Sequence, residues 1–191
     1  DIAVSGDYAY VADESSGLQI FYISTPSSPS LAAAYDFTGN VYGVAVSGKY
    51  AFVAEDNTGL QVLDISTPSQ PSPVSSFYTS GTANGDIDVS GKYAYVTLGT
   101  ACMQIIDVST PASPVSTGVF VTPAAATGLA IAGNIAYITT GDGGLTVVDI
   151  SIPSNPVNLG TYDSPGTANS VEMAGNMALV ADGKSGLHLL R

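Results

Sequence analysis

Acidic side chains recur in short, glycine-rich turns along the chain, and their type and spacing are suited to metal binding. They are Asp13, Glu55, Asp56, Asp142 and Asp182. Carboxylate oxygens are the ligands that Ca²⁺ prefers in proteins. Asp, Asn, Ser and Gly are equally the residues that tight turns require, because they bond to the local backbone or adopt positive φ. Turn geometry is therefore the simpler interpretation and a calcium site is the alternative; no other cofactor is expected.

A second set of polar residues lies near the loops that connect successive apolar segments. The candidates for a ligand-binding site are Asn40, Tyr42, Asn84, Asp86, Asp88 and Asn169. Asn84 and Asn169 occupy matching places in their loops. Asp86 and Asp88, together with Glu172, are also the carboxylates that would have to gather for the acid–base chemistry of a hydrolase or lyase. The sequence thus offers a binding site and, as an alternative, a catalytic one.

Other kinds of active site lack their residues. His188 is the only histidine and lies near the end of the sequence, which argues against a nucleophilic triad. Cys102 is the only cysteine, so an intramolecular disulfide and a thiolate metal cluster are both excluded. The glycine-rich stretch 141–144 is not followed by the helix that a phosphate-binding loop requires. We therefore expect no catalysis.

The elements that position these residues belong to a sequence repeat that occurs five times along the chain. A motif of the form Val-Ser-Gly-Lys-Tyr-Ala-Phe-Val-Ala has its glycine at positions 6, 48, 91, 133 and 175, at steps of 42, 43, 42 and 42 residues. Self-similarity at a period of this length is typical of solenoids and propellers. The repeat indicates one continuous array rather than separate domains.

Each repeat contains four short apolar segments separated by turns. In the second copy these are residues 43–47, 50–55, 60–66 and 74–79, and residues 67–71 hold two prolines that a central strand excludes. The segments alternate with the period of a strand and show no helical period. Both faces of such a sheet are apolar, and radial stacking of blades buries both. The pattern predicts a β-propeller; a straight β-solenoid is the runner-up.

The third segment of each repeat carries a family resemblance. It reads Leu-Gln-Val-Leu-Asp-Ile-Ser-Thr-Pro from Leu60, and closely similar versions begin at Met103 and Leu145. This resembles the LVIVD repeat of bacterial and archaeal surface and secreted proteins, and the resemblance implies a β-propeller. It implies no catalytic residues. The repeated aspartates, Asp64, Asp107 and Asp149, precede a Ser-x-Pro turn and are expected to accept its backbone N–H groups.

The charge balance limits the partners. The chain has 16 acidic and 4 basic residues, a net charge of −12, which excludes the clustered Lys and Arg that nucleic acid requires. The apolar segments are too short for a membrane span, so no membrane insertion is expected from this region. Few lysines and loops rich in Ser, Thr, Gly and Asn favour an extracellular or cell-surface location.

These observations predict an all-β propeller of five repeat units, four with four strands and a fifth with three. The units are 1–42, 43–85, 86–127, 128–169 and 170–191. The expected function is an extracellular structural or protein-interaction module whose partners are other protein chains or further domains. A lectin-like propeller that binds a ligand or calcium is an alternative. The three-stranded fifth unit leaves three arrangements open: a closed five-bladed ring, part of a larger propeller, or an open blade edge for self-assembly.

Overall fold

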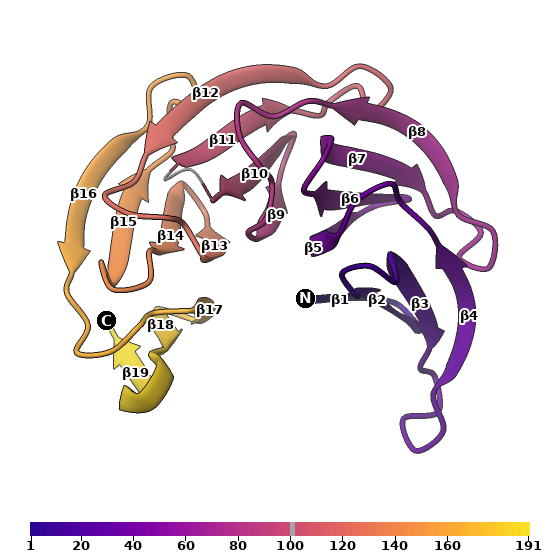
Figure 1. Ribbon diagram of the computed structural model, residues 1–191, viewed down its shortest axis with the longest axis horizontal. Coiled ribbons are helices and arrows are strands. Elements are labelled where there is room, and N and C mark those ends of the chain that lie inside the picture. Colours follow the sequence, from indigo (N-terminus) through magenta and orange to yellow (C-terminus); the bar gives the residue numbers. More distant parts are fainter. Residues whose placement is uncertain (100–101) are drawn as a thin grey trace.

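Five antiparallel sheets stand side by side in a computed structural model that describes residues 1–99 and 102–191 (Figure 1). The first four sheets each have four strands in sequence order, and the fifth has three. We call them blades 1 to 5. The predicted blade count, strand count and order are confirmed.

The strands have the following bounds. Blade 1 contains β1 (Ile2–Ser5), β2 (Tyr8–Ala12), β3 (Leu18–Tyr22) and β4 (Ser30–Tyr35). Blade 2 contains β5 (Val41–Ser47), β6 (Tyr50–Glu55), β7 (Gly59–Asp64) and β8 (Ser72–Phe77). Blade 3 contains β9 (Ile87–Ser90), β10 (Tyr93–Leu98), β11 (Cys102–Asp107) and β12 (Val115–Val121). Blade 4 contains β13 (Gly128–Ala132), β14 (Ile135–Thr139), β15 (Leu145–Asp149) and β16 (Val157–Tyr162). Blade 5 contains β17 (Ser170–Ala174), β18 (Met177–Ala181), a single 3₁₀ turn (Gly183–Ser185) and β19 (Leu187–Leu190).

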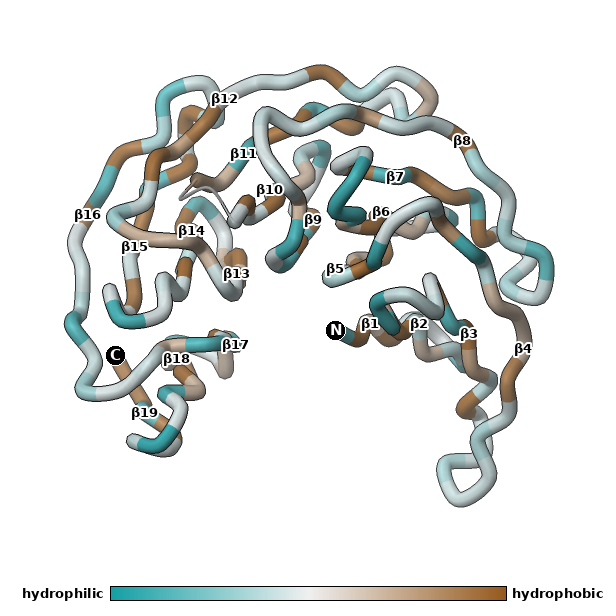
Figure 2. Tube along the Cα trace, viewed as in Figure 1, coloured by the Kyte–Doolittle hydropathy of each residue, from teal (hydrophilic) through white to brown (hydrophobic). Residues whose placement is uncertain are grey.

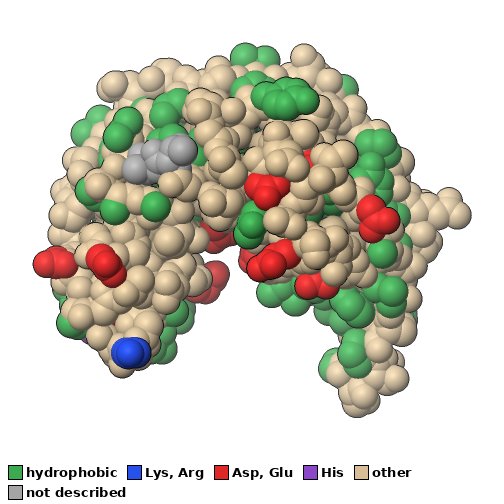
Figure 3. All heavy atoms as spheres, viewed as in Figure 1, with side chains coloured by type: hydrophobic (Ala, Val, Ile, Leu, Met, Phe, Trp, Pro, Cys, Tyr) green, Lys and Arg blue, Asp and Glu red, His purple; other side chains and the backbone are tan. Residues whose placement is uncertain are grey.

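The first strands of the blades line a central channel, and the fourth strands form the outer rim (Figure 1). Neighbouring first strands contact each other in the order β1, β5, β9, β13 and β17. Blade 5 and blade 1 are separated by a wide gap, which the space-filling view also shows (Figure 3). The five blades therefore form an open arc, and the arrangement with a closed five-bladed ring is not the one observed.

Two local features shape every complete blade. The hairpin between the first and second strands turns on a glycine with φ between +57° and +63° in all five copies, a conformation that side chains disfavour. The pairing of the third and fourth strands slips by one residue at the same place in each blade, for example between Val62 and Leu63. A bulge of this kind bends the outer strand.

The hydrophobic core lies between blades rather than within them. We call the face that a blade turns to the preceding blade its leading face, and the opposite one its trailing face. Leu18 and Ile20 on the trailing face of blade 1 pack with Val44 and Leu63 on the leading face of blade 2. Three further clusters repeat this arrangement between the next blades. Brown segments accordingly recur along the strands of every blade in Figure 2.

The repeated aspartate has the structural role that was predicted. The Oδ1 atoms of Asp64, Asp107 and Asp149 accept the backbone N–H two residues later at 2.8, 2.9 and 2.8 Å. The hydrogen bonds from Ser66 and Ser109 are the main reason that the pKa values of Asp64 and Asp107 fall to about 2. Each of these two carboxylates also pairs with a lysine, at 3.0 Å.

The described part of the chain holds no helix of the length and hydropathy needed to cross a membrane.

Candidate functional site

The channel carboxylates lie around one cavity. Residues in or directly before the first strands of all five blades line a space of 490 Å³, and Asp1, Asp86, Asp88 and Glu172 are among them. The three carboxylates that the catalytic alternative requires are thus placed at the same channel. What they bond to decides whether their oxygens are available for chemistry.

The aspartates at this channel join one blade to the next. Asp86 Oδ2 accepts the backbone N–H of Leu129 at 3.0 Å, and Asp88 Oδ2 accepts that of Ile131 at 2.9 Å. Asp1 Oδ2 accepts the N–H of Val44 at 2.8 Å in the same way. Because these N–H groups belong to the first strand of the following blade, each carboxylate is a bridge across a blade junction.

The second oxygen of each bridging carboxylate is also occupied. Oδ1 of Asp1, Asp86 and Asp88 accepts the N–H of its own following residue, at 2.7 to 2.8 Å. Burial raises the pKa of Asp86 to about 6, although the N–H groups of Leu129 and Ile87 oppose the shift. Burial also raises the pKa of Asp88, and the charge of Glu172 adds to the effect. Both carboxylate oxygens of Asp86 and of Asp88 therefore accept backbone N–H groups.

The first strands approach each other in a second way where glycine replaces the aspartate. The position of Asp1 and Asp86 is held by Gly43 in blade 2 and Gly128 in blade 4. A Cβ on Gly43 would lie 3.0 Å from the backbone nitrogen of Ile87, and one on Gly128 would lie 2.9 Å from Ser170 Cα. Carboxylate bridges and close glycine contacts therefore alternate at successive junctions.

The mouth of the channel gathers most of the predicted ligand-binding residues. Tyr42, Asn84, Asp86 and Asn169 line one pocket of 280 Å³. Asp88 lies instead in the channel wall. Asn40 is engaged elsewhere, since its backbone N–H donates to Asp56 Oδ1 at 3.0 Å and its Nδ2 to Asp56 Oδ2 at 3.3 Å.

The acidic turns hold the loops that connect the blades. Glu55 is buried, and its Oε1 accepts Thr38 Oγ1 at 2.8 Å and the N–H of Gly39 at 2.6 Å. Asp182 is also buried, and it accepts Ser164 Oγ at 2.7 Å and the N–H of Gly166 at 2.9 Å.

The remaining turn acids are more exposed. Asp142 Oδ1 accepts Thr167 Oγ1 at 2.9 Å, and Asp13 lies in an exposed turn. Across residues 1–99 and 102–191, no three His, Cys, Asp or Glu side chains lie together in a way that would hold a metal ion. Glu55, Asp56, Asp142 and Asp182 each accept a hydrogen bond from a loop that connects two blades.

One group of site residues was missed from the sequence. Gln61, Gln104 and His188 stand at the same position of the third strand and face the turn acids or the connecting loops. Gln61 Nε2 donates to Glu55 Oε2 at 3.1 Å, and Gln104 Oε1 accepts the N–H of Ser80 at 2.9 Å. His188 Nε2 lies 3.3 Å from Asp182 Oδ2. The recurrence of a polar residue after the leading Leu or Met of that strand was the available signal.

The two ends of the arc expose side chains at positions that are buried in blades inside the arc. Leu187 and Leu189 on the trailing face of blade 5 are 61% and 59% exposed, whereas Leu60 and Val62 at the same positions of blade 2 are fully buried. On the leading face of blade 1, Ile2 is 60% exposed, whereas Val44 of blade 2 is 3% exposed. These end faces are the largest departure from the repeat.

Radial four-stranded blades around a channel define a β-propeller. A family model for the LVIVD repeat matches residues 1–37, 38–79, 80–122, 124–164 and 165–190. The chain belongs to the LVIVD-repeat family. No curated protein matches it significantly.

Solved structures with the same fold include designed and natural proteins. The computationally designed Ika8 protein superimposes with a TM-score of 0.70 at 14% identity, over 98% of this chain and 56% of its own. A functionally unknown protein from Desulfotomaculum acetoxidans gives 0.80 at 13% identity, over 100% of this chain and 68% of its own. The designed Ika4 protein gives 0.60 at 17% identity, over 81% and 92%. The chain thus spans little more than half of Ika8, and at these identities the likeness concerns the fold alone.

Proposed function

We propose that this protein is an interaction module of a surface or secreted protein, which contacts other protein chains, second copies of itself or further domains of the same protein through its exposed blade faces and catalyses no reaction. The observation that carries the proposal is the exposure of Leu187 and Leu189 at positions that are fully buried in blade 2. Contiguous exposed apolar side chains on a folded domain mark interaction surfaces. The two end faces are such surfaces.

The chemistry of the channel supports the absence of catalysis. A general acid or base needs an oxygen within reach of its substrate. Both oxygens of Asp86 and of Asp88 accept backbone N–H groups. A role in joining blades accounts for Asp86 and Asp88, whereas Glu172 is exposed in the channel.

The composition supports an extracellular location. The chain has only four basic residues, and its loops are rich in Ser, Thr, Gly and Asn, which is a composition typical of secreted and cell-surface proteins. The resemblance to LVIVD-repeat proteins of bacterial and archaeal surfaces points the same way.

The proposal is tested by sedimentation velocity over a range of protein concentrations. We expect reversible association that Leu189→Asp abolishes, because a carboxylate on the trailing face of blade 5 cannot be buried without a partner. The matched control is Val121→Asp, since Val121 is 75% exposed but lies on the outer strand of blade 3. A chain that stays monomeric throughout, or that loses association only in the Val121 variant, contradicts self-association through the end faces.

A further inference from the structure

The junction between blades 3 and 4 contains a buried hydroxyl group without a partner. The side chain of Thr146 on β15 is fully buried, and its Oγ1 atom makes no hydrogen bond to any of residues 1–99 and 102–191. Buried polar groups in folded proteins are almost always hydrogen-bonded, because an unpaired one costs free energy. This hydroxyl therefore points to a bound molecule that pairs with it.

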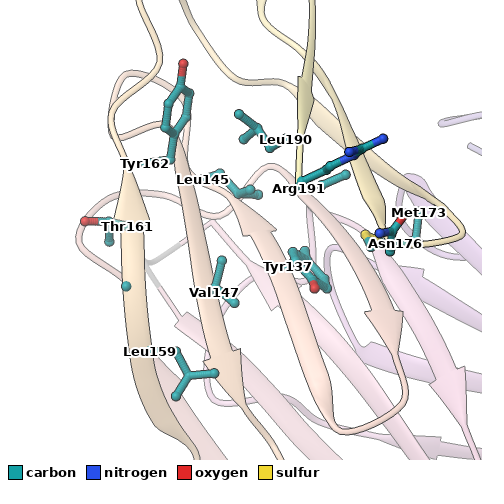
Figure 4. Close-up of a pocket in the computed structure, with 12 residues that line it drawn as sticks. Tyr137, Leu145, Val147, Leu159, Thr161, Tyr162, Met173, Asn176, Leu190 and Arg191 are labelled. Carbon is teal, nitrogen blue, oxygen red and sulfur yellow. The ribbon is translucent and has the colours of Figure 1, made fainter.

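The side chain of Thr146 faces blade 3 rather than blade 5. Its neighbours Leu145 and Val147 line a pocket on the side of blade 4 that faces blade 5 (Figure 4). Successive side chains of a strand point to opposite faces of the sheet. Ile138, which pairs with Thr146 across the sheet, is buried in the cluster that blades 3 and 4 share. The hydroxyl of Thr146 is therefore enclosed between these two blades.

At two other junctions, a carboxylate occupies the centre of the equivalent contact. Between blades 1 and 2, Glu55 Oε1 accepts Thr38 Oγ1 of the connecting loop at 2.8 Å. Glu55 Oε2 accepts Gln61 Nε2 of the third strand at 3.1 Å. Asp182 joins the loop and the third strand between blades 4 and 5 in the same way. The turn acid thus links the connecting loop to the third strand.

Between blades 3 and 4, all three of these positions hold a threonine. The loop, turn and strand residues are Thr122, Thr140 and Thr146, and they are 3%, 1% and 0% exposed. Thr122 Oγ1 donates to the carbonyl oxygen of Ala124 at 2.7 Å, and Thr140 Oγ1 donates to that of Gly144 at 3.3 Å. Because threonine is shorter than glutamate, Thr140 makes no hydrogen bond to Thr146.

We propose that a buried water molecule binds at this contact and takes the part that the carboxylate has at the other two junctions. The Thr146 hydroxyl donates to the water. The water donates to the oxygens of Thr122 and Thr140, whose own hydrogens are already engaged. These are three hydrogen bonds, the usual number for a buried water.

The chemistry of the site selects this ligand. Two threonines in place of a Glu and a Gln remove several heavy atoms from the contact, and a water needs roughly 30 Å³. Three neutral hydroxyls bind a small neutral molecule rather than an ion, because a buried ion requires a group of opposite charge. The inference goes beyond the proposed function and does not depend on it.

The first test is Thr146→Val, which keeps the shape of the side chain and removes its hydroxyl. With the water bound, the variant loses one of its hydrogen bonds, and the melting temperature should fall by about 2–4 °C. In a dry contact, the same change would remove an unpaired buried hydroxyl and raise the melting temperature. The matched control is Thr161→Val, because Thr161 pairs with Thr146 across the sheet and is exposed. Its melting temperature should stay within about 1 °C of the wild-type value.

The second test is a crystal structure at a resolution that shows ordered waters. The wild-type protein should have density for a water within hydrogen-bond distance of Thr146 Oγ1. In Thr140→Glu, which restores the acid of the other junctions, the carboxylate should displace this water and accept the Thr146 hydroxyl directly.

Three outcomes overturn the proposal. One is a melting temperature that rises in Thr146→Val. Another is a wild-type crystal structure in which Thr146 Oγ1 bonds to a protein group or has no density beside it. The third is a water that keeps its place in Thr140→Glu, because the water would then not substitute for the carboxylate.

Discussion

Blade 2 and blade 5 have nearly the same third strand and very different surroundings. Leu60 and Val62 are fully buried between blades 2 and 3, while Leu187 and Leu189 face solvent at the end of the arc. Their strands pair with the second strand in the same register. The comparison teaches that the sequence of a blade defines its sheet, whereas burial of its faces depends on the neighbouring blade.

The largest expected difference between the two blades is the effect of an alanine substitution in the third strand of each. Leu60→Ala should lower the free energy of unfolding by about 2–5 kcal/mol, the cost of a cavity in a packed core. Leu187→Ala should change it by less than about 0.5 kcal/mol, because an exposed side chain loses little packing. Urea denaturation of both variants measures the difference. Equal losses would show that the end face is covered in solution.

The pH dependence of stability gives a second test, through the carboxylate of Asp86 that bridges blades 3 and 4. The folded-state pKa of Asp86 is about 6, above its ordinary value, so the folded protein binds this proton more tightly than the unfolded chain does. The stabilisation is therefore fully present below about pH 4 and lost as the pH rises through about 6; it amounts to up to about 3 kcal/mol.

Urea denaturation between pH 4.5 and 7 measures the effect, and Asp86→Asn should flatten the slope. Asp64 and Asp107 do not interfere, because their pKa values of about 2 place their losses at lower pH. A slope that persists unchanged in Asp86→Asn would assign it to another group, with Asp88 the next candidate.

A pair of glycines provides a smaller contrast on the outer strands. Gly118→Ala should destabilise the protein by about 1–3 kcal/mol, because its Cβ meets the backbone of the next blade. Gly160→Ala should be neutral or stabilise by up to about 1 kcal/mol, since the site is open and the unfolded chain loses freedom. Thermal melting of both variants checks this. Destabilisation by Gly160→Ala would mean that another segment covers the outer strand of blade 4 in solution.

The smallest expected effect is that of calcium. Glu55 and Asp182 already accept hydrogen bonds from the connecting loops. Adding CaCl₂ after treatment with EDTA should therefore leave the melting temperature within about 1 °C, whereas a specific ion would raise it. A larger rise that Glu55→Gln removes would restore the metal-binding alternative.

Most of the fold could be predicted from the repeat in the sequence. The strands of the second copy lie within two residues of their predicted bounds at every end, and the role of Asp64 in its turn was correct. These features depend on contacts within one repeat, which a single copy of the motif displays.

Contacts between repeats were harder to foresee. The bond from the Leu129 N–H to Asp86 joins residues 43 positions apart, so the side chain is one blade away from its partner. The sequence offered Asp86 and Asp88 as ligand or catalytic groups because both stand near a loop. Only the register between blades shows that they face backbone N–H groups. The opening between blades 1 and 5 likewise depends on the curvature of the whole array.

The hairpin glycines have one more consequence. At Gly6, Gly48, Gly91, Gly133 and Gly175, an added Cβ would meet nothing within 4 Å. These turns recur once per blade at the same end of the sheets, away from the packed faces. Longer inserts at such exposed tips are well tolerated. The fold thus supplies a row of equivalent grafting points on a rigid frame, where new surface can be added blade by blade without disturbing the interior.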